Sequence, residues 1–213
     1  MPDLKTRCTT ITGRLSYPAI FKPADPLKEG DTPKYQLELI FSKDDDISEL
    51  REMVSNAIKN KFGGKTPANL KLPFRDGDAE RQDEEGNVRD GYENGIFICP
   101  RSVDKPGVVM GREREPVENQ SDVYGGCWVR CSVTAYYYEK GKVNKGIAFA
   151  LNHVWKIRDG EPFASRVSAE QDFAESEVDD AEFDDDAEAM GYSRDDDDGE
   201  TSGGGSGKKH SLI

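Results

Sequence analysis

One stretch of alternating side chains limits what this chain can fold into more than any other. Residues 124–158 have the pattern of two long β-strands joined by a tight turn. Neighbouring side chains of a strand point to opposite faces. One face of the first strand is a core face, made of Cys127, Val129, Cys131, Val133, Ala135 and Tyr137. The other carries Trp128, Arg130, Ser132, Thr134, Tyr136 and Tyr138. Rings and cations on one face are typical of surfaces that bind unpaired nucleic-acid strands.

This hairpin and its neighbours supply the candidate residues for binding single-stranded DNA. We expect bases to stack on aromatic rings and phosphates to follow the arginines and lysines, so that binding is sensitive to salt and indifferent to sequence. The predicted set is Phe97, Arg101, Trp128, Arg130, Tyr136, Tyr138, Lys140, Lys142, Lys145 and Trp155. For Phe97 and Trp155 the sequence leaves a place in the core as the alternative.

The negative charge of the chain is concentrated near its C-terminal end. Residues 170–213 hold 16 acidic and 3 basic side chains, which accounts for the whole formal charge of −13. Residues 1–169 are therefore neutral, and the acidity of the chain does not argue against a nucleic-acid partner. We expect residues 1–169 to form the DNA-binding domain and residues 170–213 to form a disordered acidic tail.

Two functions are open for this acidic tail. It could compete with DNA for the basic face and recruit replication partners, or it could serve only as a solubilising segment. The last residues, GETSGGGSGKKHSLI, form a glycine-serine spacer and a basic-hydrophobic end. Whether this end is native stays open.

Two acidic clusters raise the alternative of a metal-dependent nuclease. Asp44, Asp45 and Asp46 precede a helix expected over residues 47–61, and residues 76–90 hold seven acids and two arginines. A nuclease would need these carboxylates to converge around Mg²⁺. Helix capping already explains the aspartates, and the composition of residues 76–90 is that of a solvated loop. We therefore expect no metal, no cofactor and no enzymatic activity.

The remaining pattern predicts an all-β domain with one helix. Strands are expected at residues 6–16, 34–42, 95–100 and 108–110, with Tyr17-Pro18 ending the first and Gly63-Gly64 ending the helix. Together with the hairpin, these strands favour a five-stranded Greek-key barrel of the OB-fold type, followed by the disordered acidic tail.

Three segments also resemble a known family. They are GYENGIFICPRS at residues 91–102, DVYGGCWVRCSVTAYYY at residues 122–138, and residues 144–173. They are similar to the single-stranded DNA-binding proteins of tailed phages and, more distantly, to the replication single-strand-binding proteins of podoviruses. The resemblance implies an OB-fold core, binding with little sequence preference and an acidic C-terminal tail. It also implies a phage protein that coats and protects single-stranded DNA during replication or recombination in the host cytoplasm.

The expected partners are single-stranded DNA and, through the tail, replisome or recombination proteins. No apolar run is long enough for a signal peptide or a bilayer span, so no membrane partner is expected. Weak self-association, the choice between DNA and RNA, and the choice between annealing and protection stay open. The main alternative is an acidic protein-interaction factor or DNA mimic that ignores DNA.

Overall fold

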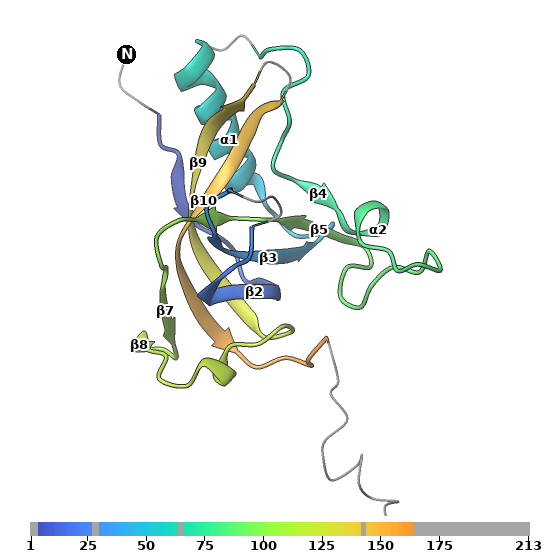
Figure 1. Cartoon of the computed structure of the whole chain (residues 1–213), viewed down its shortest axis with the longest axis vertical. Coiled ribbons are helices and arrows are strands. Elements are labelled where there is room, and N and C mark those ends of the chain that lie inside the picture. The colour runs from blue at the N-terminus through green and yellow to red at the C-terminus, as the bar shows by residue number, and fades with distance from the viewer. Residues whose placement is uncertain (1–3, 27–29, 64–65, 142–143, 164–213) are drawn as a thin grey trace, which may run out of the picture. The chain divides into compact units, whose positions relative to one another are not determined.

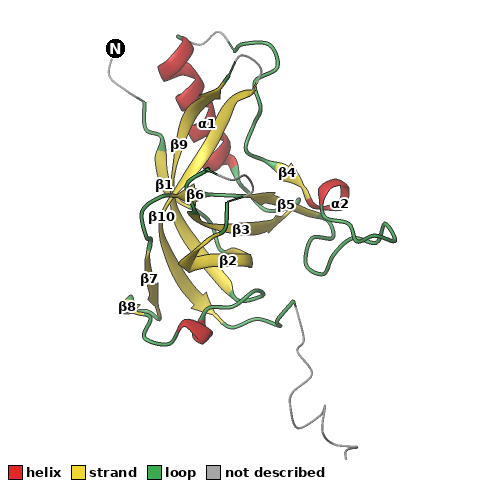
Figure 2. Ribbon diagram, viewed as in Figure 1, coloured by secondary structure: helices red, strands yellow, loops and turns green. Residues whose placement is uncertain are grey.

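The computed structural model describes residues 4–26, 30–63, 66–141 and 144–163, which form a mostly β structure with one long helix (Figures 1 and 2). The predicted binding residue Lys142 and the predicted tail, residues 170–213, lie outside the described residues. Within the described part, no helix is long and apolar enough to cross a membrane.

A closed barrel forms the centre of the structure. Its strands are β2 (Gly13–Ala24), β3 (Lys34–Ser42), β5 (Gly95–Ile98) with β6 (Arg101–Ser102), β9 (Trp128–Lys140) and β10 (Asn144–Arg158). Antiparallel pairs link β9 to β2, β2 to β3, and β3 to β5 and β6. A parallel pair joins β6 to β10, and β10 closes the barrel by pairing with β9. This order confirms the predicted OB-fold barrel.

Short elements surround the barrel. They are β1 (Arg7–Thr9), β4 (Arg75–Asp76), α2 (Gly77–Glu80), β7 (Gly107–Met110), β8 (Glu115–Pro116) and a 3₁₀ turn at Gln120–Asp122. β1 pairs with β9, while β7 runs parallel to β10 and carries β8 on its other edge. In Figure 1, helix α1 (Ser48–Phe62) lies near the tip of the β9–β10 hairpin, and β7 and β8 lie beside the other end of β10.

The core follows the alternation of the hairpin. Val129, Cys131 and Val133 are fully buried, and the inward set predicted for β9 is confirmed, with Tyr137 half-buried at its end. The apolar stripe of α1, which includes Leu50 and Val54, packs against β9 and β1. The core therefore holds β9 in place, and the outer side chains of this strand stand on a rigid support.

The ends of α1 agree with the sequence pattern to within a residue. The helix begins at Ser48, whose N–H donates to the Asp46 carboxylate over 2.9 Å. It ends at Gly63, which adopts the left-handed conformation with φ of 62°. A residue without a Cβ takes this conformation at the least cost, and the predicted stop at Gly63 is confirmed.

The first predicted strand differs from the structure. It is split into β1 and β2, and β2 continues through Tyr17-Pro18 as far as Ala24. The register with β3 shifts between Ser16 and Ala19, and Tyr17 has a φ of 43°. Proline has no N–H to donate to a neighbouring strand, and at such an irregularity none is required. Pro18 therefore interrupts the pairing without ending the strand.

Residues 76–90 are attached to the barrel rather than solvated throughout. Lys43 bridges Asp76 and Asp78 at 2.9 and 2.7 Å, and the Asp76 carboxylate caps the single turn of α2. Arg81 pairs with Glu38 of β3. These contacts make the segment one wall of the site described next.

Candidate nucleic-acid interface

Four of the predicted binding residues line one groove near the hairpin tip. Tyr136, Tyr138 and Lys140 of β9 and Arg101 of β6 border a hollow of about 590 Å³ that lies over β10. Tyr136 is 41% exposed, which leaves much of its ring free to stack on a base. Arg101 joins this aromatic surface because β6 pairs with β10 next to Ala150.

The same groove continues between two loops. Lys34, Arg101 and Lys140 also border a hollow of about 600 Å³ whose other side is the connection from β2 to β3. A 3.1 Å ion pair between Lys140 and Asp31 joins this connection to the hairpin. OB-folds bind oligonucleotides on this sheet face, between the corresponding loops.

In the opposite direction, the groove extends past residues 76–90. Arg101 and Cys99 border a further hollow of about 360 Å³, which reaches Tyr17 and Arg89. Tyr17 and Arg89 in turn border the largest hollow, of about 760 Å³. We call these four adjoining hollows the front groove, which has Lys140 at one end and Phe163 at the other.

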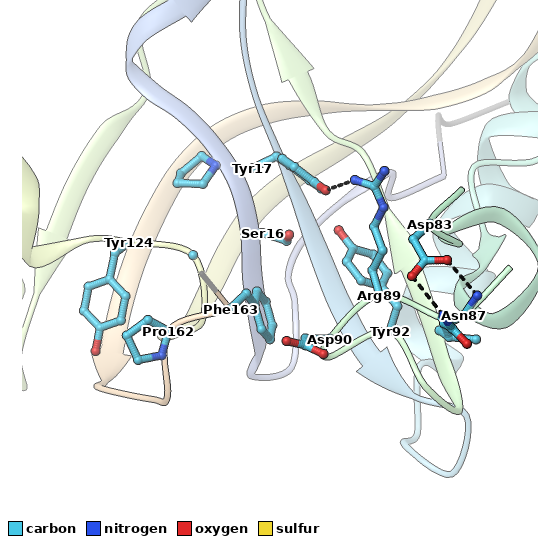
Figure 3. A pocket seen from close by; sticks show the side chains of 13 residues that line it. Ser16, Tyr17, Asp83, Asn87, Arg89, Asp90, Tyr92, Tyr124, Pro162 and Phe163 are labelled. Atoms are coloured by element: carbon cyan, nitrogen blue, oxygen red, sulfur yellow. Dashed lines mark hydrogen bonds between the residues drawn. The ribbon is translucent and has the colours of Figure 1, made fainter. Parts of the chain in front are cut away.

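Aromatic rings surround the largest hollow (Figure 3). The Tyr17 hydroxyl accepts a 2.7 Å hydrogen bond from the Arg89 guanidinium, and Tyr17 is 52% exposed. Phe163 lies across the hollow from this pair, and Tyr92 and Tyr124 also border it. This end therefore combines exposed ring surface with a guanidinium, as the hairpin end does.

A polar cluster beneath the groove fixes one of its walls. The Glu38 carboxylate pairs with Arg81 and accepts a 2.6 Å hydrogen bond from the Tyr92 hydroxyl. Burial alone would raise the pKa of Glu38, but the bonds from Arg81 and Tyr92 outweigh it and leave this pKa below its ordinary value. Burial and the neighbouring Glu38 raise the pKa of the Cys99 thiol to about 11. Glu38 therefore stays ionised and holds Arg81 against the barrel.

Three other predicted residues, Trp128, Arg130 and Trp155, lie at the other end of the paired strands β9 and β10. Arg130 and Trp155 are paired across β9 and β10, six residues along β9 from Tyr136. At the strand rise of about 3.3 Å per residue, this separation is about 20 Å. The predicted residues therefore form two groups rather than one compact site.

Trp128, close to the second group, already has two cationic partners. Arg158 lies 4.2 Å and Arg14 lies 5.3 Å from the centre of its ring. Arg14 also lies 4.5 Å from the centre of the Phe163 ring, at the end of the front groove. A base that stacks on Trp128 must share this ring with the two guanidiniums.

Comparison with known proteins identifies the family. The family model described as the single-stranded DNA-binding protein of Enterobacter phage Enc34 matches residues 6–184. The chain belongs to this family. We call it the Enc34 family below.

Two solved structures of the Enc34 phage protein have a similar fold. The single-stranded DNA-binding protein of bacteriophage Enc34 in complex with single-stranded DNA is 29% identical, with a TM-score of 0.62 over 75% of this chain and 90% of the other. A second structure of the same phage protein is 28% identical, with a TM-score of 0.59 over 79% of this chain and 90% of the other. The gp2.5 protein of bacteriophage T7 is more remote, at 16% identity and a TM-score of 0.49 over 77% and 98%. No curated protein sequence matches the chain.

Two residues predicted for the binding face of this Enc34-family member are placed elsewhere by the structure. Phe97 is fully buried beneath the guanidiniums of Arg75 and Arg81, so its assignment to the binding face is wrong. Lys145 lies opposite Glu139, on the face of the hairpin that Tyr136 and Tyr138 do not share. The register of β10 therefore removes Lys145 from the groove.

Several residues that border the front groove were not predicted from the sequence. Tyr17, Lys34, Arg89 and Phe163 border the front groove, although none belongs to the alternating hairpin. Among these residues, only Phe163 could have been found from the sequence, because it falls within a segment that resembles the family. Tyr17 and Arg89 reach the groove through the β2 irregularity and the folding of residues 76–90, neither of which follows from a periodic pattern. Lys34 begins a strand that was predicted, but the pattern of this strand does not show that its start borders the groove.

Several acidic residues of the nuclease alternative are used in other contacts. Asp45 accepts a 2.8 Å hydrogen bond from the Ser42 N–H, and Asp83 accepts one of the same length from the Asn87 N–H. Across the described ranges, no three histidine, cysteine or acidic side chains form a group suited to a metal ion. The convergence that this alternative needs is not present there.

Proposed function

We propose that the chain binds single-stranded DNA along the front groove, without preference for sequence. The observation that carries the proposal is the continuity of the four hollows. Arg101 borders three of them, and Tyr17 and Arg89 border one of these three as well as the fourth, so that the hollows form one path across the barrel. Family membership and the DNA-bound structure of the Enc34 relative support it.

The residues along this path suggest how a strand is held. Lys34, Arg89 and Arg101 form no ion pair with an acid among the described residues, so no described carboxylate competes with phosphates for their charge. Tyr17 and Tyr136 offer exposed rings to the bases. Each base that stacks on a ring contributes on the order of 1–3 kcal/mol, and every base has a face that can stack. This arrangement supports binding that is blind to sequence and weakened by salt.

The biological role follows from the same chemistry and the phage family. We propose that the protein coats and protects single strands during phage DNA replication or recombination. The acidic tail, residues 170–213, then competes with DNA for the groove and recruits replication partners when DNA displaces it. Its net charge of −13 and its aromatic residues support this role, since both mimic features of a nucleic-acid strand.

Fluorescence anisotropy of a labelled oligo-dT tests the proposal. Full-length protein is titrated into the single strand and into the matching duplex, at low and at moderate salt. We expect binding to the single strand alone, and weaker binding as salt is added. If the protein binds neither strand form, the proposal is wrong and an acidic protein-interaction factor becomes the better hypothesis. Cleavage of the strand that EDTA abolishes would instead favour the nuclease.

A further inference from the structure

A second aromatic and basic hollow lies away from the front groove. Its volume is about 460 Å³, and Arg112, Arg130, Trp155 and Ile157 are among its lining residues. We call these four residues, together with Arg114, the Trp155 patch. The hollow shares no lining residue with the four hollows of the front groove.

The turn between β7 and β8 builds this patch. The Trp155 indole N–H donates a 2.8 Å hydrogen bond to the Gly111 carbonyl oxygen, which holds the turn against β10. The guanidinium of Arg114 then lies 4.6 Å from the centre of the Trp155 ring. Gly111 and Arg114 both have positive φ, of 70° and 59°. The turn is thus folded so that its arginines border a half-buried indole.

Among the described residues, the arginines of the patch have no acidic partner. Arg112, Arg114 and Arg130 form no salt bridge with any described carboxylate, although Glu113 and Glu115 alternate with the first two along the chain. The one hydrogen bond that the Arg130 side chain makes to a described residue runs from Nε to the Thr12 hydroxyl, over 3.2 Å. Its terminal nitrogens therefore remain available. Guanidiniums of this kind match the geometry of phosphate oxygens.

We propose that the Trp155 patch binds a second stretch of single-stranded DNA, an inference that rests on the proposed function. Three guanidiniums that pair with no described carboxylate fit a row of phosphates, and the edge of an indole beside the exposed Ile157 offers a surface for a base. Arg130 of the patch lies six residues along β9 from Tyr136 of the front groove, a separation of about 20 Å. One molecule thus holds two stretches of strand on separate surfaces, which is the arrangement that bringing two strands together requires.

Native mass spectrometry with oligo-dT of about six nucleotides tests this proposal, since that length is near the lower end of OB-fold site sizes. We expect full-length protein to take up two oligonucleotides per chain. The Arg112→Gln/Arg114→Gln variant changes two exposed turn residues and should take up one, with the affinity of the first unchanged. Two lost phosphate contacts should also lower the salt slope of the second binding step by about 1.4.

The matched control is Lys5→Gln/Lys59→Gln, which removes the same charge from exposed positions that border none of these hollows. It should keep both oligonucleotides. A front-groove variant, Arg101→Gln with Tyr136→Ala, should lose the tighter of the two binding steps and keep the other.

Other outcomes separate this inference from the proposed function. If wild type takes up only one oligonucleotide and the front-groove variant takes up none, the inference of a second site is wrong and the proposed function stands. Two oligonucleotides on the Arg112→Gln/Arg114→Gln variant would also overturn it. A peptide of residues 170–198 provides a further test. Suppose that wild type takes up one oligonucleotide and binds this peptide, and that only the Arg112→Gln/Arg114→Gln variant fails to bind the peptide. The patch then holds an acidic peptide, and its assignment to DNA is wrong.

The source of the second stretch is decided with an oligo-dT of about 30 nucleotides, well beyond one OB-fold site. Uptake of two long strands per chain means that the patch serves a separate strand. If the chain takes up one long strand, and this strand blocks the short oligonucleotide from both sites, a single strand continues from the front groove to the patch. Either result supports the inference that the patch binds DNA.

Discussion

Glu38 of β3 and Arg81 of residues 76–90 form an ion pair beneath the front groove, with side chains only 13% and 20% exposed. The pair connects the barrel to the segment that presents Arg89 to the groove. Tyr92, which donates to the same carboxylate, closes the connection from the other side. The shape of this wall therefore depends on one carboxylate.

Replacing that carboxylate should destabilise the domain. In Glu38→Gln the Arg81 guanidinium keeps its buried position and loses its counter-charge, for which a cost on the order of 3 kcal/mol is expected. Urea denaturation measures this difference. Glu49→Gln is the control, since Glu49 pairs with Lys5 at an exposed position and should change stability by less than about 0.5 kcal/mol. Equal effects of the two variants would contradict the structural role of Glu38.

The same pair predicts a dependence of stability on pH. The pKa of Glu38 is lowered in the folded state from an ordinary value of 4.5. The contribution of the Glu38 carboxylate to the stability of the folded state is therefore complete above pH 4.5, and it is lost as the pH falls through the pKa of the folded state. The melting temperature of wild type should fall more steeply below pH 4.5 than that of Glu38→Gln. The two proteins share all other carboxylates, so the difference between the curves reports Glu38. Parallel curves for the two proteins would argue against this coupling.

Tyr136 should contribute to DNA affinity through its ring alone. Tyr136→Ala is expected to weaken binding of oligo-dT about tenfold, because one stacking surface of 1–3 kcal/mol is lost. Tyr136→Phe keeps the ring and should bind like wild type. Anisotropy titrations compare the three proteins, and the exposed position of Tyr136 predicts nearly equal melting temperatures. If the alanine variant binds normally, bases do not stack at this position.

Arg101 should act through charge, since it borders three of the four hollows. Arg101→Gln is expected to lower the slope of log affinity against log salt by about 0.7, which corresponds to one phosphate contact on a single strand. Lys59→Gln on α1, which removes a charge away from the groove, should leave the slope unchanged. The slope itself is measured by titrations at several salt concentrations, and an unaltered slope in Arg101→Gln would exclude the phosphate contact.

Much of the barrel could be predicted because its strands alternate regularly. The hairpin and β3 follow from period-two patterns, and Gly63 marks the end of α1. The site was harder, because it depends on register and on irregular segments. Lys145 is next to Gly146 in sequence, yet one step along a strand reverses the face of a side chain. Phe97 is aromatic, as a base-stacking residue would be, but it packs against Tyr92 in the core.

Removal of the acidic tail should strengthen DNA binding. A chain that ends at Ala169 loses the segment with net charge −13, and with it the competitor for the groove. We expect tighter binding of oligo-dT, with the larger gain at low salt, where charge repulsion is least screened. Anisotropy of both chains at two salt concentrations measures the gain. Identical affinities would reduce the tail to a solubilising segment.

The parallel pairing of β6 with β10 also determines when the domain can fold. β10 closes the barrel by pairing with β9, β6 and β7, so the barrel cannot close before residues 144–158 are synthesised. Contacts between such distant parts of a chain form slowly, since a large loop has to close before any of them is made. During synthesis the apolar faces of β3 and β9 remain uncovered, which makes the incomplete chain prone to aggregation until its last strand arrives.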